Sequence, residues 1–235
     1  MAEDTRAEGG ARRAPIVAID GPSGAGKGTV ARAVAERLKY RHVDTGAMYR
    51  AVAWKALQDR IDLRDEAAVA ELADRASFVL EDGRVVIDDR DVTRAIRTPE
   101  IDRAAALVAR LPRVRRALVA TQRQVGGAGA VVMEGRDIGT VVFPDADVKI
   151  YLDASPEERA KRRASDPAHA ASTGRAVGDV AIALAERDRS DSTRTDSPLV
   201  MAPDAVHIET TDVPIERVVD RVLEIVRASA ARNHG

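Results

Sequence analysis

The chain has 235 residues, a formal net charge of −1 at pH 7 and no cysteine. Its length suits one sizeable α/β domain with inserted subdomains, and a hydrophobic content of 45% suits a globular core. The balanced charge argues against a nucleic-acid binder, which needs a basic surplus, and the missing cysteines exclude disulfides and thiolate metal sites. No run approaches the roughly eighteen apolar residues of a membrane span, so we expect a cytoplasmic protein without nucleic-acid or membrane partners.

The first elements expected along the chain are a buried strand and a glycine-rich loop. Residues 1–14 are polar and charged, contain no apolar stretch that would serve as a signal peptide, and are predicted to be a disordered tail. Pro15–Asp20 is a short apolar run typical of a strand in a parallel sheet. The loop that follows consists of Gly21, Pro22, Ser23, Gly24, Ala25, Gly26, Lys27, Gly28 and Thr29.

This loop has the chemistry of a phosphate-binding loop. Glycines let successive backbone N–H groups converge on an anion, and the helix that begins there adds its positive end. Lys27 supplies a full charge near the β- and γ-phosphates of a nucleotide. A glycine-rich turn that merely opens a helix is the alternative, but it does not account for a lysine in this register. Thr29 follows the lysine by two residues, which leaves open whether it would bind Mg²⁺ directly or through water, so we assign no metal ligand.

The middle of the chain is predicted to carry a small antiparallel insert at about residues 76–98. Asp82-Gly83 lies between the strand-like runs Phe78–Glu81 and Arg84–Ile87, which is typical of a β-hairpin. Before the insert we expect a strand at Arg41–Asp44 and helices at Gly46–Leu57 and Asp65–Arg75. After it we expect helices at Glu100–Arg110 and Pro112–Val125.

Strand–helix alternation resumes in the rest of the chain. We expect strands at Ala130–Met133, Val148–Leu152 and Ala205–Glu209, and helices at Pro156–Ala164, Asp179–Arg189 and Pro214–Ala230. Asp166–Gly178 is rich in alanine, glycine and serine without periodicity, and is predicted to be a mobile loop. Alternation of this kind predicts an α/β fold with a parallel sheet covered by helices on both faces.

Two further motifs narrow the class of phosphate-loop protein. Guanine recognition in GTPases uses an N-K-x-D motif, but the only asparagine is Asn233, and no apolar strand ends in Asp-Glu as in a motor or transporter ATPase. Instead, EGRDIGT (134–140) follows one expected strand and DTGAMYR (44–50) follows another. Both place charged side chains at the carboxyl edge of the sheet, where such sheets bind ligands. A charged loop explains the first segment alone, and a capped helix start explains the second.

Together these segments resemble bacterial-type cytidylate kinase, a nucleoside monophosphate (NMP) kinase. The matching stretches are IDGPSGAGKGT (19–29), DTGAMYR (44–50), PRVR (112–115), EGRDIGTVVFPDA (134–146) and the ERD, D, R and PL positions within 186–199. The resemblance implies a three-layer P-loop NMP kinase fold, in which a five-stranded parallel sheet carries an antiparallel NMP-side insert and a helical lid. We place the lid at about residues 156–195, within a single domain of residues 15–235 that we expect to be a monomer.

The resemblance also implies the reaction, which is transfer of the ATP γ-phosphoryl group to CMP or dCMP, with Mg²⁺ accompanying ATP. Residues 21–29 would hold the ATP phosphates. The residues implied in catalysis are Lys27, Arg136, Arg162, Arg163 and Arg194. Those implied in substrate binding are Thr45, Arg50, Arg115, Arg136, Asp137, Arg187, Asp191 and Arg194.

Within that set the resemblance assigns separate tasks. Arg50, Arg136 and Arg194 would bind the CMP phosphate through bidentate guanidinium groups. Arg115 and Asp137 would contact the edge of cytosine, and Arg187 and Asp191 would face the sugar. Arg159, Arg162 and Arg163 would lie in or beside the lid. A solvated helix face explains the run Lys161-Arg162-Arg163 equally well. Adjacent residues on a helix point about 100° apart, so Arg162 and Arg163 need not share one role.

The expected chemistry requires no general base. The attacking oxygen belongs to a phosphate that is already ionised at neutral pH, so catalysis is positioning plus neutralisation of charge on the transferred group. We therefore assign no role to His42, His169, His207 and His234. A non-catalytic nucleotide-binding protein is the main rival, and the presence of Lys27 and the three phosphate-binding arginines argues against it.

One position departs from the family pattern. Just before PRVR the family often carries a serine that helps to contact the base, and by our placement Ala106 stands there. The missing hydroxyl removes one contact to the pyrimidine. We therefore expect discrimination against UMP to be clear but incomplete, while the preference between CMP and dCMP stays open.

Overall fold

The computed structural model describes residues 14–81, 83–166 and 176–232. The predicted disordered tail at residues 1–14 lies outside these ranges except for Ala14. Residues 167–175 of the predicted mobile loop Asp166–Gly178 also lie outside them, whereas Val177 and Gly178 of that loop form the start of a helix.

A five-stranded parallel sheet with the strand order β2-β6-β1-β7-β8 forms the centre of the fold. The strands are β1 (Ile16–Asp20), β2 (Arg41–Asp44), β6 (Val131–Gly135), β7 (Val148–Asp153) and β8 (Val206–Glu209). Every residue of β1 and β6 is buried, as expected for inner strands of a sheet that is covered on both faces. The fold class predicted from the sequence is confirmed.

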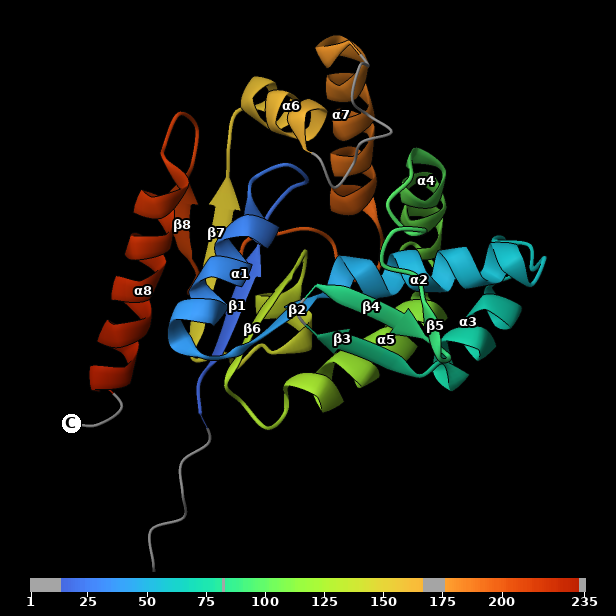
Figure 1. Cartoon of the computed structure of the whole chain (residues 1–235), viewed down its shortest axis with the longest axis horizontal. Coiled ribbons are helices and arrows are strands. Elements are labelled where there is room, and N and C mark those ends of the chain that lie inside the picture. The colour runs from blue at the N-terminus through green and yellow to red at the C-terminus, as the bar shows by residue number, and fades with distance from the viewer. Residues whose placement is uncertain (1–13, 82, 167–175, 233–235) are drawn as a thin grey trace, which may run out of the picture.

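Helices cover both faces of this sheet (Figure 1). On one face, α1 (Lys27–Leu38) and α8 (Ile215–Arg232) pack against β1 and β7 through residues such as Val30, Val34 and Val222. On the other face, α5 (Pro112–Gly126) and the π-helix η1 (Ile138–Val142) pack against β1 and β6. The sheet is thus the middle of three layers, and its carboxyl edge stays available for polar side chains.

A second group of helices, called the acceptor-side helices below, packs beside the sheet and carries residues that were predicted to bind the acceptor nucleotide. It contains α2 (Thr45–Gln58), α3 (Glu66–Arg75) and α4 (Pro99–Val108), which share an apolar core with α5. The antiparallel insert consists of β3 (Phe78–Glu81), β4 (Arg84–Ile87) and β5 (Arg90–Asp91). Val85 and Ile87 of β4 pack against Ala47 and Ala51 of α2, so the insert supports the helix that bears Arg50.

The two helices within the segment that we predicted to be the lid, called the lid helices below, are α6 (Pro156–Ser165) and α7 (Val177–Thr193), which stand at the top of Figure 1. They pack on each other through a small core of Ala160, Val180 and Leu184. α7 also contacts α4, so the lid helices reach the acceptor side of the molecule.

Apart from shifts of one or two residues at element ends, the structure differs from the sequence-based elements at three places. β5 and η1 were not predicted, and α7 begins at Val177 and runs to Thr193 rather than spanning Asp179–Arg189. The extension matters because it places Asp191 inside a helix and leaves Arg194 as its C-terminal flanking residue.

Candidate active site

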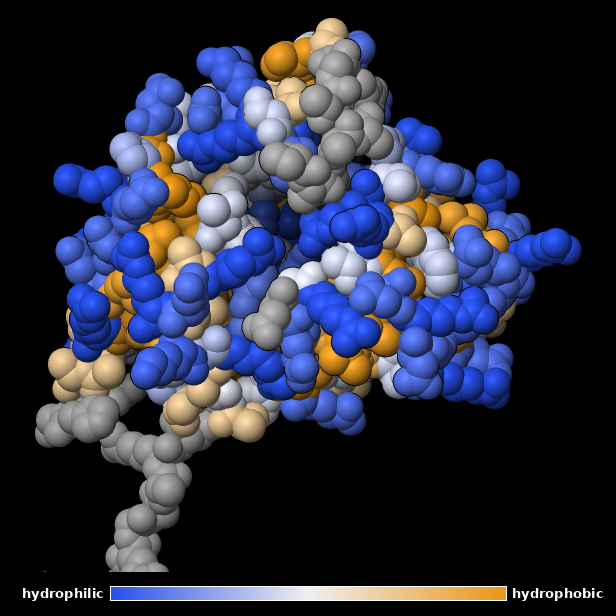
Figure 2. Space-filling model, viewed as in Figure 1, coloured by the Kyte–Doolittle hydropathy of each residue, from blue (hydrophilic) through white to orange (hydrophobic). Residues whose placement is uncertain are grey.

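A cavity of about 520 Å³ lies where the phosphate loop, the acceptor-side helices and the lid helices meet. Figure 2 shows hydrophilic residues around the recess below the α6–α7 end of the molecule. The predicted site residues that line it are Ser23, Gly24, Gly26, Lys27, Gly28, Thr29, Thr45, Arg50, Arg115, Arg136, Asp137, Arg162, Arg163, Arg187, Asp191 and Arg194. Within the described part of the chain, the predicted residues outside this lining are Gly21, Pro22 and Ala25.

The phosphate loop is shaped by glycines whose conformations other residues adopt only with strain. Gly24 has a φ of 83° and Gly26, the N-cap of α1, has a φ of 88°. Gly21 packs so closely on β7 that an added Cβ would lie 2.0 Å from the carbonyl oxygen of Leu152. Gly21 therefore anchors the loop to the sheet, which explains why it does not line the cavity.

Lys27 points into its own loop. Its Nζ donates to the carbonyl oxygen of Pro22 at 2.6 Å, and the residue is only 6% exposed. Burial, with a further contribution from the nearby charge of Arg136, lowers the pKa of Lys27 to about 7. The ammonium group is therefore close to losing its proton until an anion joins it.

The segment after β2 holds both a helix cap and a cavity-lining arginine. Asp44 accepts a hydrogen bond from the backbone N–H of Ala47 at 3.0 Å and pairs with Arg50 at 2.8 Å. Thr45 donates its hydroxyl to the carbonyl oxygen of Glu134 at 2.7 Å. Asp44 thus caps the start of α2, as one interpretation of the motif predicted. The same carboxylate holds Arg50 at the cavity wall.

Asp20, at the end of β1, holds the turn after β6 in place. The two carboxylate oxygens of Asp20 accept backbone N–H groups of Ile138 and Gly139, both at 2.8 Å. Asp137, just before this turn, forms a buried ion pair with Arg115. The Arg115 guanidinium also lies 5.5 Å from the ring centre of Tyr49. Arg115 and Asp137, which were predicted to contact the base, are therefore paired with each other, and Arg115 also packs on Tyr49.

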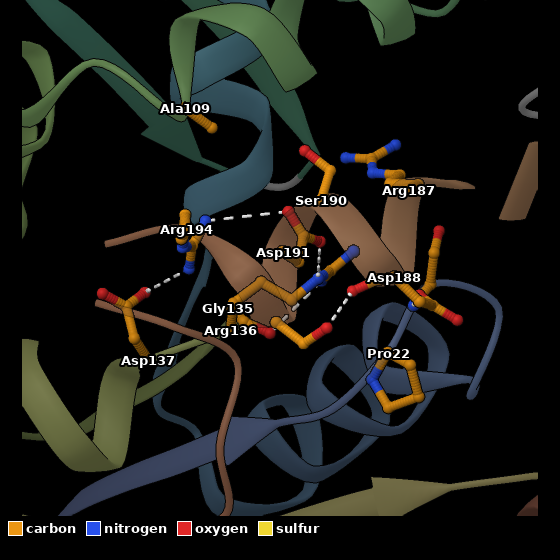
Figure 3. A network of polar contacts seen from close by, with 12 residues as sticks. Pro22, Ala109, Gly135, Arg136, Asp137, Arg187, Asp188, Ser190, Asp191 and Arg194 are labelled. Atoms are coloured by element: carbon orange, nitrogen blue, oxygen red, sulfur yellow. Dashed lines mark hydrogen bonds and ion pairs between the residues drawn. The ribbon is translucent and has the colours of Figure 1, made fainter. Parts of the chain in front are cut away.

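Arg136, Asp191 and Arg194 form a second network beside the first (Figure 3). Arg136 Nε donates to Asp191 at 2.9 Å, and Arg194 lies 3.7 Å from Asp191 and 3.9 Å from Asp137. Arg194 Nε also donates to the carbonyl oxygen of Ser197 at 2.5 Å. Although burial opposes it, the charge of Arg136 helps to hold the pKa of Asp191 below its usual range. Asp191 thus stays ionised and fixes both arginines.

Comparison with known proteins gives these networks a family context. A family model described as cytidylate kinase matches residues 17–228. The chain belongs to the cytidylate kinase family. It is 49% identical to the cytidylate kinase of Solibacter usitatus, covering 91% of this chain and 92% of that protein, and 48% identical to that of Pelotomaculum thermopropionicum, covering 93% and 97%. An uncharacterized protein from Eubacterium ventriosum has a TM-score of 0.53 at 10% identity, over 91% of this chain and 98% of that chain, and shares the fold.

Membership in the cytidylate kinase family confirms the resemblance found in the sequence and makes this chain an ATP-dependent kinase. In the residues that the structure describes, no helix has the length and apolar character needed to span a membrane. The shared family does not assign the individual site residues, so their roles rest on the geometry.

Arg162 and Arg163 of α6 point in different directions. Arg162 donates to Glu158 at 2.8 Å and to the carbonyl oxygen of Thr210 at 2.6 Å. Arg163 pairs with Asp102 of α4 at 2.5 Å. The prediction that the two adjacent side chains point in different directions is confirmed.

Arg159 connects the lid to the phosphate loop. It forms an ion pair with Asp188 of α7 and donates to the carbonyl oxygen of Ser23 at 3.2 Å. The Ser23 N–H in turn lies 3.4 Å from Asp188. The contacts make Arg159 part of the loop's support rather than of a solvated helix face.

His42 and Asp102 are among the residues beside the cavity that sequence reasoning missed. His42, which was given no role, lies 3.0 Å from Glu134 through Nε2. Alternation along β2 places His42 and Asp44 on the same face, and this spacing could have revealed the contact. Asp102 belongs to no motif, and only the folded arrangement of α4 against the lid helices shows its contact with Arg163.

Proposed function

We propose that this chain transfers the γ-phosphoryl group of ATP to CMP and dCMP, giving ADP and CDP or dCDP. The observation that carries the proposal is a single cavity that joins two chemically different ends. Lys27 and the phosphate loop form one end, and the Arg115–Asp137 pair with the Arg136–Asp191–Arg194 network forms the other. This arrangement supports a reaction between two nucleotides that meet through their phosphates.

At the donor end, the loop N–H groups and Lys27 would bind the ATP phosphates. The N-terminus of α1 adds its positive end, since α1 begins at Lys27 directly after the loop. Arg162 lies close to this end, because its Nη1 would be 3.7 Å from a Cβ placed on Gly26. These groups supply the positive charge that the transferred phosphoryl group needs.

At the acceptor end, three arginines would bind the CMP phosphate. Arg50, Arg136 and Arg194 line the cavity and are already oriented by carboxylates, Arg50 by Asp44 and the other two by Asp191. Guanidinium groups that are fixed beforehand lose less conformational freedom when they bind a phosphate. The acceptor oxygen would thus be positioned in line with the γ-phosphate.

The base contacts follow from the polar pattern of cytosine. Its N4 amino group is a donor and its N3 and O2 are acceptors, so Asp137 would accept from N4 and Arg115 would donate to N3 or O2. Arg187 and Asp191 would face the sugar, where both CMP and dCMP are accepted. Ala106 lines the same cavity without a hydroxyl, which supports incomplete rejection of UMP.

Mg²⁺ would accompany ATP, and the donors beside the loop fit it. Thr29 lines the cavity, and a carboxylate oxygen of Glu134 lies 3.2 Å from where a Cβ of Gly28 would stand. Within the described ranges, no group of three or more His, Cys, Asp or Glu side chains could hold a metal by itself. An ion held mainly by nucleotide phosphates and water suits this donor set. Thr29 and Glu134 would hold it, and its charge would help to neutralise the phosphate oxygens.

A coupled ADP-release assay with AMP, GMP, CMP, dCMP, UMP and dTMP tests the proposal. We expect CMP and dCMP to give the highest kcat/KM and UMP a lower one. Lys27→Ala should lower kcat by about 10²–10³-fold, because the transferred group loses its nearest fixed cation while the loop backbone is kept. Binding of CMP without ADP release by the unaltered protein would contradict the proposal and favour a non-catalytic nucleotide-binding protein. The cytoplasmic location and the monomeric state stay predictions.

A further inference from the structure

Three helices meet at one carboxylate that the proposed reaction does not use. Asp102 of α4 pairs with Arg163 of α6 at 2.5 Å, and its other oxygen lies 3.7 Å from Arg187 of α7. All three side chains are largely buried, with exposed fractions of 17% for Asp102, 16% for Arg163 and 20% for Arg187. The carboxylate therefore links the acceptor-side helix to both lid helices.

The two arginines need such a partner. Burial lowers the pKa of Arg163, and burial together with the charge of Arg136 lowers the pKa of Arg187 to about 10. In both cases the negative charge of Asp102 acts in the opposite direction and favours the guanidinium ion. A fixed carboxylate also selects the orientation of a planar guanidinium group.

Asp102 acts from behind the cavity wall. Arg163 and Arg187 line the cavity, whereas Asp102 is not among the described residues that do so. A second contact joins the same helical layers farther along, because Arg110 donates to the carbonyl and hydroxyl oxygens of Ser190 on α7 at 3.2 and 3.1 Å. Arg110 follows the end of α4, so the segment from α4 to Arg110 is held against α7 at two points, and Asp102 makes the contact that reaches cavity arginines.

We propose that Asp102 is a positioning residue for phosphoryl transfer, which holds Arg163 and Arg187 at the cavity wall and so couples α4 to α6 and α7. The proposal rests on the proposed function, since the arginines act on nucleotide phosphates and sugar. Removing the charge leaves both guanidinium groups in place but free to turn and to repel their cationic neighbours. The variant should then lose kcat and kcat/KM for CMP, although no residue that would contact a nucleotide has been removed.

The chain offers a matched control for the structural contribution of Asp102. Glu100 and Asp102 are both acidic residues of the first turn of α4, where negative charge stabilises a helix. Glu100 is exposed, whereas Asp102 is not. Glu100→Gln therefore removes the same kind of helix stabilisation as Asp102→Asn while leaving the two arginines untouched.

Kinetics with CMP and ATP test the proposal directly. Asp102→Asn should lower kcat/KM for CMP by about tenfold, Glu100→Gln by less than about twofold, and Asp102→Glu should recover most of the loss because it restores the charge. The loss from Asp102→Asn should shrink when Arg163→Gln is already present, because the two residues then no longer act as a pair. Equal kinetics for Asp102→Asn and Glu100→Gln, or full additivity with Arg163→Gln, would overturn it.

Amide hydrogen exchange of the nucleotide-free protein separates this proposal from the proposed function. Exchange in α6 and α7 should be faster in Asp102→Asn than in Glu100→Gln, since the link to α4 is weakened. If the unaltered protein transfers no phosphoryl group to CMP, the proposed function fails, and the exchange comparison alone decides whether Asp102 holds the lid helices. Equal exchange in the two variants would then overturn the role of Asp102.

Discussion

Lys27 is a cation enclosed by the loop to which it belongs. Its ammonium group donates to the carbonyl oxygen of Pro22, and burial lowers its pKa to about 7. The same burial that makes the charge costly in the free protein makes it effective toward phosphate, because few water molecules compete for it. The protonation of Lys27 should therefore be linked to ATP binding.

We expect ATP binding at pH 8 to take up about one proton, since Lys27 is mostly neutral in the free protein and the ATP phosphates raise its pKa. For the same reason the affinity for ATP should fall as the pH rises from about 7 to 9. Calorimetry in two buffers with different ionisation enthalpies measures the uptake. Lys27→Met should abolish it, and the absence of uptake in the unaltered protein would show that the lysine is already fully protonated.

Asp137→Asn should narrow the difference between CMP and UMP in kcat/KM. Uracil places O4, an acceptor, opposite the carboxylate, and a neutral amide can donate to it. The difference in kcat/KM should not disappear, because Arg115 would still face the N3–H of uracil. Activity with CMP should also fall, since Arg115 loses its buried ion-pair partner.

Ala106→Ser is the matched variant, because it adds a hydroxyl to the same cavity and should widen the difference between the two substrates. Sites built on polar pairing reject mismatched substrates by factors of up to about 10⁴, so there is room for an increase. Measurement of kcat/KM for CMP and UMP in both variants decides the matter. An unchanged ratio in Asp137→Asn would mean that Asp137 does not contact the base.

At the scale of elements, the phosphate loop and helix α6 pack against each other backbone to backbone. A Cβ on Gly24 would lie 2.9 Å from both the Cβ and the carbonyl oxygen of Arg159, and Gly24 has a φ of 83°. Arg159 then returns a hydrogen bond to the carbonyl oxygen of Ser23. The loop and the first turns of α6 are therefore shaped together.

Gly24→Ala should raise the KM for ATP by at least about tenfold and lower the melting temperature. The left-handed backbone costs about 1–2 kcal/mol for a residue with a Cβ, and the clash with Arg159 displaces either the loop or α6. Gly178→Ala is the control, since no described atom lies within 4 Å of its Cβ position near the start of α7. That variant should be neutral or slightly stabilising, and equal effects of the two substitutions would contradict the packing argument.

The elements that were predicted correctly have sequence signals within them or directly beside them. The Asp82-Gly83 sequence predicted β3 and β4 at their observed bounds, and Pro112 marked the start of α5. β5 has only two residues, Arg90 and Asp91, and depends on pairing with β4, so no local pattern announces it. α7 extends beyond its predicted end to Thr193, and the hydroxyls of Ser192 and Thr193 donate to carbonyl oxygens within its last turn.

The candidate site was predictable where it follows motifs and not where it depends on packing between distant helices. The phosphate loop and the arginines after β2 and β6 come together because the carboxyl ends of parallel strands share one edge. The partner of Arg163 on α6 was not predictable in the same way. Asp102 and Arg163 are far apart in sequence, and only the contact between α4 and the lid helices brings them together.

At the scale of the whole molecule, positive charge is concentrated where the nucleotides would bind. The net charge of the chain is −1, yet the described residues that line the cavity include ten cationic side chains and five carboxylates. Burial and neighbouring cations lower the pKa of Arg187 to about 10 and that of Lys27 to about 7. The free protein therefore holds mutually repelling charges, which cost stability until an anion enters.

Ligands that carry phosphate should consequently stabilise the fold more than their uncharged counterparts. A ligand at a hundred times its dissociation constant adds about 2.7 kcal/mol, which corresponds to a rise of about 5–10 °C in the melting temperature of a protein of this size.

At equal concentration, CMP should raise the melting temperature clearly more than cytidine, because cytidine lacks the group that neutralises the arginines. Arg50→Ala should reduce the shift caused by CMP while leaving that caused by ATP nearly unchanged, since we propose that Arg50 binds the acceptor phosphate and Lys27 the phosphates of ATP. Scanning calorimetry with CMP, cytidine and ATP measures all three shifts. Equal stabilisation by CMP and cytidine would show that the arginines do not bind the acceptor phosphate, and an Arg50→Ala variant that loses only the ATP shift would reverse the assignment of the two ends of the cavity.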